Sequence, residues 1–118
     1  MLEDQDEIYL KLLLSIAKEK LYQEVDHQFY LKDELKILTS EHDLDGLTYK
    51  LEIDDLKIIN LARKIFIDIY QVSYNYFGYI YGDEFEYSIV ERIKSNIRYF
   101  IEKRFREHGL DVCYGNLF

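Results

Sequence analysis

Hydrophobic and polar positions recur with helical spacing over most of the chain. The clearest pattern runs from Asp54 to Tyr81, where polar residues are confined to one narrow stripe with spacings of three and four. That stripe consists of Lys57, Asn60, Lys64, Asp68, Gln71 and Asn75. Because nearly every other position is apolar or aromatic, we predict a helix over residues 54–81 that other elements cover on most sides. It is the expected central helix of the fold.

Two further amphipathic helices flank this segment. Apolar residues recur at helical spacing over residues 4–31, where Asp4 is suited to cap the first turn. Residues 83–108 repeat the pattern, and Gly109 then favours a left-handed turn that ends the helix. The sequence therefore predicts a mainly α fold, a small bundle of three long helices forming a single domain over residues 1–118.

The segment between the first two helices is compatible with two structures. A strand is favoured by four apolar residues that alternate with polar ones: Leu47, Tyr49, Leu51 and Ile53. Leu35 and Ile37 could supply the opposing strand, which gives a short β-hairpin at residues 35–53. The alternative is helical structure on both sides of a loop at Gly46. The sequence alone leaves both structures open.

Composition and charge limit the classes of function. Hydrophobic residues make up 48% of the 118 positions, there is no proline, and a single cysteine excludes an internal disulfide and fits a reducing compartment. The first residues are acidic where a secretory signal is basic, and no apolar run is long enough to span a membrane, so we expect a cytoplasmic protein without a membrane partner. The net charge of −8 is concentrated in residues 1–55. It disfavours direct binding to nucleic acid and favours a partner protein with a basic surface.

One acidic segment nearly matches a calcium-binding loop. With Glu41 as the first position, further carboxylates follow at the third, fifth and twelfth positions, and Gly46 occupies the sixth. Glu in place of Asp at the first position and Thr48 at the eighth depart from the motif. We therefore interpret residues 41–52 as an acidic turn and predict no metal, with a calcium-responsive regulatory domain as an alternative function.

An enzymatic function is the second alternative. Arg104 and His108 lie one helical turn apart and could serve a small nuclease-like enzyme as a cation and an acid–base group. A helix terminus whose cations meet the negative end of the helix dipole explains the same residues more simply. The sequence also contains no phosphate loop, paired-cysteine zinc motif or nucleophile elbow. We predict no catalytic residue and no cofactor, and therefore not an enzyme.

Aromatic residues crowd residues 70–87 more densely than a small core can use. Exposed tyrosines are enriched at binding hot spots. We therefore expect an acidic protein-binding module: an inhibitor, immunity or anti-defence protein that occludes a basic surface of a partner protein. A narrower form of this expectation is that the partner surface binds nucleic acid, which the acidic chain mimics. A homodimer through the Tyr-rich end is a further expectation. The predicted partner-binding residues are Asp43, Asp45, Asp54, Asp55, Tyr74, Tyr76, Tyr79 and Tyr81.

Overall fold

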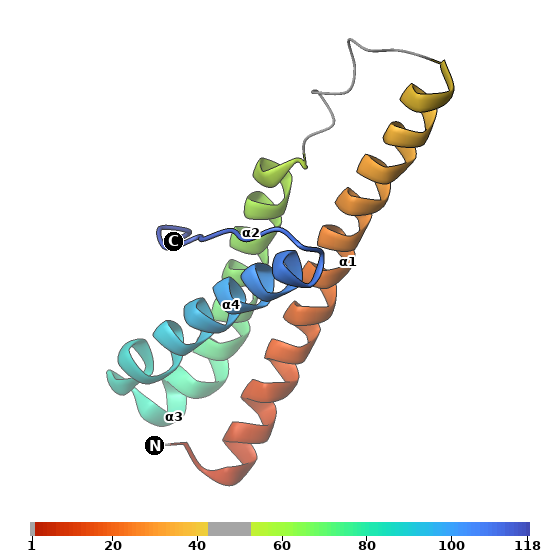
Figure 1. The fold of residues 1–118 in the computed structure, drawn as a ribbon. Helices are drawn as coiled ribbons and strands as arrows, with labels where there is room; N and C mark the ends of the chain where they lie inside the picture. Colours follow the sequence, from red (N-terminus) through yellow and green to blue (C-terminus); the bar gives the residue numbers. More distant parts are fainter. Residues whose placement is uncertain (1, 43–52) are drawn as a thin grey trace.

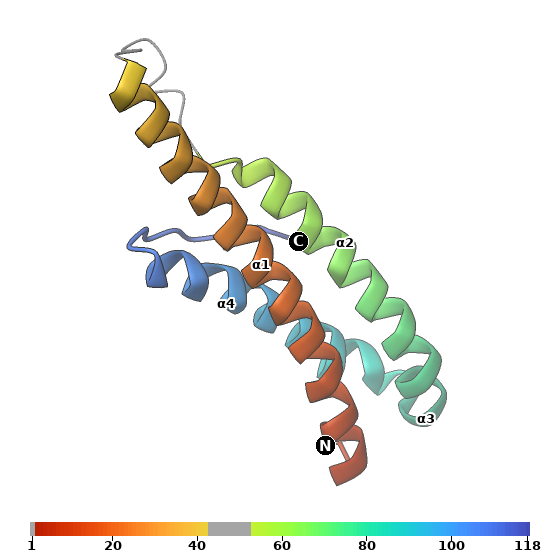
Figure 2. The same ribbon diagram turned by 90° about the vertical axis from the view of Figure 1, so that its right-hand side faces the viewer.

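Long helices make up most of the molecule. A computed structural model describes residues 2–42 and 53–118, with side chains as far as Glu34 in the first range. Helix α1 (Asp4–His42) and helix α2 (Asp55–Ser73) run antiparallel side by side, and helix α4 (Glu91–Glu107) packs against both (Figures 1 and 2). The molecule is elongated, with extents of 61 × 23 × 21 Å. The described residues contain no strand, so the prediction of a mainly α protein is confirmed.

The helix predicted over residues 54–81 consists of three consecutive helical pieces. Helix α2 continues into a π-helical segment, η2 (Tyr74–Gly78), and then into the short α3 (Tyr79–Tyr81). Asp54 caps its start, where the side-chain carboxylate accepts a hydrogen bond from the backbone N–H of Lys57 at 3.2 Å. Gly82 ends it with a φ of 60°, a left-handed conformation that glycine adopts without strain. Both predicted ends are therefore confirmed.

Helix α2 is covered on one face only. Its exposed aliphatic side chains include Leu56, Ile67 and Val72. The expectation that other elements cover this helix on most sides is wrong, because two neighbouring helices can reach only part of its circumference. The continuous buried seam instead follows α4 through four residues spaced four apart: Ile93, Ile97, Ile101 and Phe105. Among the described residues, no helix has both the length and the apolar character required to cross a membrane.

Helix α1 is longer than the sequence pattern predicted. It continues past residue 31 to His42, so Leu35 and Ile37, the first strand of the expected hairpin, have helical backbone. The chain before residue 46 contains no glycine or proline, and residues 32–42 are rich in Leu, Lys and Glu, which favour helix over strand. The rest of the expected hairpin, residues 43–52, lies outside the described residues.

The last helix ends as its sequence predicts. A second π-helical segment, η3 (Glu86–Val90), leads into α4. Gly109 follows the helix with a φ of 85°, and its N–H donates to the carbonyl of Arg106 at 2.9 Å. The N–H of Leu110 donates to the carbonyl of Phe105, also at 2.9 Å. This pair of bonds defines a Schellman motif, which satisfies carbonyls that the helix itself leaves without partners.

The C-terminal tail returns across α2 and α4 and closes that side of the core (Figure 1). Leu117 is buried, and its carbonyl accepts a hydrogen bond from Nε of Arg63 at 3.1 Å. The ring of Phe118 packs on Phe66 with 4.8 Å between centroids. The tail therefore contributes to the core without adding a regular element.

Candidate protein-binding surface

A buried carboxylate joins the first turn of α1 to the α3 end of the second helical segment. Asp6 is only 6% exposed, and it accepts hydrogen bonds from the hydroxyls of Tyr76, at 2.9 Å, and Tyr81, at 2.5 Å. The backbone N–H of Glu3 also donates to the Tyr81 hydroxyl. Hydrogen bonding to Asp6 raises the pKa of both tyrosines, so both remain neutral donors at pH 7. Two segments about 70 residues apart in the sequence thereby form one end of the molecule.

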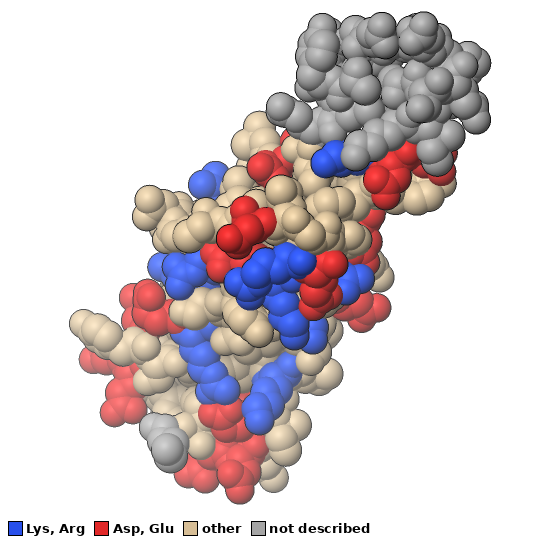
Figure 3. Space-filling model, in the orientation of Figure 1, with Lys and Arg blue, Asp and Glu red and all other residues tan. Residues whose placement is uncertain are grey.

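This end of the molecule is strongly acidic. Residues 1–10 contain four Asp or Glu and residues 65–91 contain five, whereas neither segment contains a Lys or Arg. The exposed carboxylates here, which we call the acidic pole, belong to Glu3, Asp4, Asp83, Glu84 and Glu86. Figure 3 shows acidic side chains gathered around the N-terminus and the α3 end, and basic side chains mainly over α4. Outside these two segments, acidic and basic residues nearly balance.

Arg92, the first cation after residues 65–91, does not neutralise the acidic pole. Arg92, at the start of α4, donates two hydrogen bonds to the carboxylate of Glu7, at 2.6 and 2.7 Å. Hydrogen bonding from Arg92 lowers the pKa of Glu7, which keeps that carboxylate ionised. The two charges cancel each other, and the pair connects α4 to the first turns of α1. Arg92 therefore does not pair with the exposed carboxylates of the pole, which face solvent.

Two tyrosines project from the same end of the molecule. Tyr79 is 93% exposed and Tyr87 is 87% exposed. Ile80 and Tyr74 are also about half exposed, and the ring of Tyr74 packs edge-on against the buried Phe85 with centroids 5.7 Å apart. Tyr74 lies in η2 and Tyr87 in η3, whereas Tyr79 and Ile80 lie in α3, which directly follows η2. Turns of π-helix occur frequently at functional sites. Large aromatic surface is therefore presented next to the carboxylates of the pole.

The four predicted tyrosines divide into two pairs. Tyr74 and Tyr79 are exposed near the acidic pole. Tyr76 is 38% exposed and Tyr81 is half-buried, and the hydroxyls of both are engaged by Asp6. The second pair therefore holds the N-terminal turn in place, which is a structural contact that the spacing of tyrosines along one helix did not indicate.

The two predicted aspartates that the structure describes, Asp54 and Asp55, lie away from the tyrosines. Asp54 and Asp55 are at the other end of the same helical segment, about 40 Å from α3 at the usual rise per residue. Asp54 is the helix cap, and Asp55 accepts a hydrogen bond from the hydroxyl of Tyr114 at 3.2 Å. Asp43 and Asp45 lie outside the described residues. The structure therefore does not bring the described members of the predicted set into one surface.

Sequence reasoning missed part of the acidic pole. Tyr87, Glu3 and residues 83–86 were not among the predicted partner-binding residues. A signal was present in the sequence, because residues 65–91 contain no Lys or Arg. Dividing the chain at residue 55 into an acidic part and a nearly neutral part hid that signal, since residues 65–91 fall within the nearly neutral part.

A second charged cluster joins α1 to α4. Asp26 accepts hydrogen bonds from Nε and Nη2 of Arg104, at 2.7 and 2.8 Å, and its Oδ1 lies 2.7 Å from Nε2 of His108. Hydrogen bonding from Arg104 lowers the pKa of Asp26. The ring of His108 stacks on Phe29 at 4.1 Å, and Glu107 pairs with Arg104 at 2.6 Å. Arg104 and His108, the two residues considered for an enzymatic function, therefore both contact a carboxylate of α1.

The remaining alternative function, a calcium-responsive regulatory domain, requires a metal site. Within the part of the chain that the structure describes, no three His, Cys, Asp or Glu side chains are grouped so that they could hold a metal ion. The candidate calcium loop at residues 41–52 lies outside the side chains described.

The chain matches no protein-family model, no curated protein and no solved structure.

Proposed function

We propose that this chain is an acidic protein-binding module whose acidic pole covers a basic surface of a partner protein. The observation that supports this most directly is the near-complete exposure of Tyr79 and Tyr87 beside five exposed carboxylates. Tyrosine is enriched among residues that dominate binding energy, because it adds a large rigid contact area at low entropic cost. The carboxylates favour encounter with cationic side chains.

The two kinds of residue have different tasks in this proposal. The carboxylates steer and orient the partner during encounter, which raises the association rate. The tyrosines enter pockets of the partner and slow dissociation. The bonds from Tyr76 and Tyr81 to Asp6 fix this end of the molecule before binding, so less conformational entropy is lost on association.

The biological role proposed is inhibition by occlusion, as for an inhibitor, immunity or anti-defence protein. Surfaces that bind nucleic acid are rich in Lys and Arg because they neutralise phosphates. A pole with carboxylates and without Lys or Arg in its two sequence segments is suited to occupy such a surface in place of the phosphate backbone. The chain itself would then bind protein and not nucleic acid.

The test begins with capture of partners from a lysate of the source cell on the immobilised chain. Tyr79→Ala with Tyr87→Ala is the aromatic variant. Its matched control is Tyr30→Ala, because Tyr30 is 60% exposed on α1 and lies away from the pole. We expect a specific basic protein to be retained by the wild type and the control and lost from the double variant. Retention by all three chains would contradict the proposal.

Kinetics on the captured protein then separate the two tasks. Each true hot-spot tyrosine should speed dissociation by about 30-fold on truncation, the equivalent of about 2 kcal/mol. Lysine substitutions at Asp83 and Glu84 should mainly slow association and reduce its dependence on salt. The charge control is lysine substitution at Asp33 and Glu34, which are exposed elsewhere on α1. Equal effects of both charge variants would show that net charge, and not the pole, governs binding.

A further inference from the structure

The C-terminal tail, α2 and α4 border a hollow with a volume of about 470 Å³, which we call the tail hollow. Its lining residues come from all three parts of the chain: Arg63, Phe66, Ile67, Lys94, Leu117 and Phe118. Four of these side chains are apolar, two are cations, and none is acidic. The volume is within the range of about 300–1,000 Å³ that is usual for sites that bind small molecules.

Two arginines fix the wall that the tail contributes to this hollow. Nε of Arg63 donates to the carbonyl of Leu117 at 3.1 Å. Nη1 of Arg98 donates to the carbonyl of Gly115 at 3.4 Å. The side chain of Leu117 is also buried. The hollow is therefore formed before any ligand enters it, so little conformational entropy is lost when a ligand binds.

The two cations of the tail hollow are both able to pair with an added anion. Among the described residues, Arg63 takes part in no ion pair, and its only side-chain hydrogen bond is the one from Nε. Its Nη1 and Nη2 groups remain as an edge to which a carboxylate can bind through two parallel hydrogen bonds. Lys94 lies 3.7 Å from Glu91 of the same helix. Exposed pairs of this kind are weak, so a bound anion competes well with Glu91 for Lys94.

The positive charge of the tail hollow is a local feature of an acidic chain. The net charge of the chain is −8, but salt screens exposed charges from one another beyond about 10 Å at an ionic strength of about 0.1 M. Figure 3 shows basic side chains mainly over α4, the helix that supplies Lys94. An anion in the hollow therefore interacts chiefly with Arg63 and Lys94 and much less with the net charge.

Two phenylalanine rings form most of the apolar part of the tail hollow. The ring of Phe118 packs on Phe66 with 4.8 Å between centroids, and Nζ of Lys94 lies 5.6 Å from the centroid of the Phe66 ring. Ile67, beside them, is 52% exposed. Flat aromatic groups pack well on such rings in offset or edge-on contacts. A complementary ligand therefore has a negative group on one side and a flat apolar body on the other.

We propose that the tail hollow binds a small aromatic carboxylate. The carboxylate pairs with Arg63 and Lys94, and the ring of the ligand packs on Phe66 and Phe118. Two cations without an acid in the lining favour this ligand over a neutral or cationic one of the same shape. No residue of the acidic pole and neither projecting tyrosine takes part, so the site does not depend on the proposed function.

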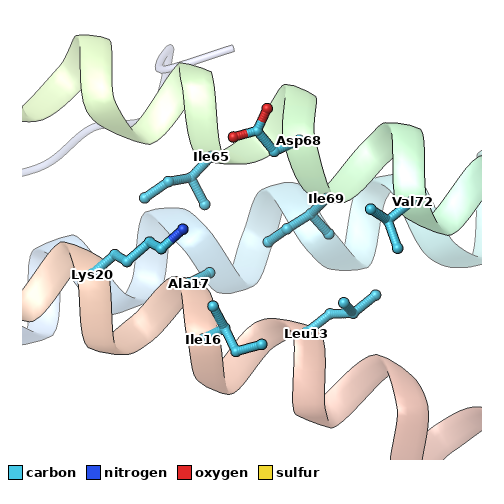
Figure 4. Close-up of a pocket in the computed structure, with 8 residues that line it drawn as sticks. All are labelled: Leu13, Ile16, Ala17, Lys20, Ile65, Asp68, Ile69 and Val72. Carbon is cyan, nitrogen blue, oxygen red and sulfur yellow. The ribbon is translucent and has the colours of Figure 1, made fainter.

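The cavity between α1 and α2 lacks this preference for an anion. It has a volume of about 110 Å³, and Figure 4 shows its lining side chains, which are aliphatic apart from Lys20 and Asp68. One cation and one acid at this cavity offset each other, so an anion gains little over a neutral molecule there. Binding of an aromatic ring alone in this cavity can therefore be separated from binding in the tail hollow.

Titration of the purified full chain with 2-naphthoate, followed by the NMR shifts of the backbone amides, tests the site. The neutral control is 2-naphthylmethanol, which has the same ring without the charge. We expect 2-naphthoate to bind with a dissociation constant below about 1 mM and at least about tenfold more tightly than the alcohol. The largest shifts should occur in the tail and the adjoining turns of α2 and α4. Weaker binding, equal affinities, or largest shifts at the cavity between α1 and α2 would overturn the proposal.

A pair of charge variants tests the part played by Lys94. Lys94→Gln removes the charge without removing a hydrogen bond that holds the tail. The matched control is Lys64→Gln, because Lys64 is exposed on α2 and does not line the hollow. Lys94→Gln should weaken binding of 2-naphthoate by about three- to fivefold and leave binding of 2-naphthylmethanol unchanged. Equal weakening by the two variants would show that net charge governs binding, which contradicts the proposed site.

Two further measurements test recognition of the aromatic body. Phe118→Ala should weaken binding of 2-naphthoate, whereas Tyr30→Ala, at a site 60% exposed on α1, should not. Inorganic phosphate, an anion without an apolar body, should produce no saturable shift below about 10 mM. Circular dichroism of each variant checks that the fold is retained. Full affinity in Phe118→Ala, or phosphate binding as tight as that of 2-naphthoate, would overturn the proposed class of ligand.

Discussion

The ion pair between Asp26 and Arg104 tests how α4 is held on α1. The perturbation is substitution by alanine, as Asp26→Ala, Arg104→Ala and the double variant. The guanidinium donates two hydrogen bonds to the carboxylate, at 2.7 and 2.8 Å, and the two side chains are 39 and 29% exposed. Charge-assisted bidentate bonds are among the stronger polar contacts in proteins. Exposure to solvent weakens them, so the expected coupling free energy lies between that of a surface ion pair and that of a buried one.

The size of this coupling free energy follows from the geometry of the pair. Exposed ion pairs contribute about 0.2–1 kcal/mol, and hydrogen bonds to charged groups contribute about 1.5–3 kcal/mol when shielded. We expect a coupling free energy of about 1–1.5 kcal/mol between Asp26 and Arg104 in the double-mutant cycle. Arg104→Ala alone should cost more than Asp26→Ala, because Arg104 has two further contacts and Asp26 has one. Arg104 also lies 4.8 Å from the centroid of the Tyr22 ring and pairs with Glu107, whereas Asp26 also contacts His108. The cycle subtracts these additional contacts.

Urea unfolding at neutral pH measures the coupling. The control cycle uses Glu91 and Lys94, which are 3.7 Å apart within one helix and should couple by about 0.3 kcal/mol. Because Arg104 lowers the pKa of Asp26, the ionised carboxylate stabilises the folded state. That contribution is complete above the ordinary pKa of about 3.9 and disappears as pH falls through the lower folded value. A coupling no larger than that of the control, or one that persists below that pH range, would refute the reasoning.

Three further predictions concern single positions, each measured by urea unfolding. Ile97→Ala should lower the free energy of unfolding by about 2–5 kcal/mol, because Ile97 is fully buried, whereas Ile67→Ala at a half-exposed site should cost well under 1 kcal/mol. Gly109→Ala should cost about 1–2 kcal/mol because of its positive φ, while Gly115→Ala, with open space around its Cβ position and no positive φ, should be nearly neutral. Tyr79→Ala should change stability by less than about 0.5 kcal/mol, which separates a role in binding from one in folding.

The sequence alone determined where the second helical segment begins and ends, and where the third one ends. The carboxylate of Asp54 caps a helix within its own first turn, and Gly82 and Gly109 adopt left-handed conformations at helix ends. These features depend on residues within about one turn, so a local pattern is sufficient to predict them. The end of the first helix was predicted less well. Alternation beyond residue 46 suggested a strand partner at Leu35, whereas the backbone there continues α1.

Only the tertiary structure decided which faces and charges come together. The apolar pattern of residues 54–81 indicated a covered helix, but coverage depends on how many neighbours pack against it, and α1 and α4 leave Ile67 and Tyr79 exposed. Asp6 meets Tyr76 and Tyr81, and Asp26 meets Arg104, across separations of 70 residues or more. Helical periodicity fixes the face on which a residue lies and leaves open which helix that face meets, so the acidic pole appears only when the packed helices bring its two segments together.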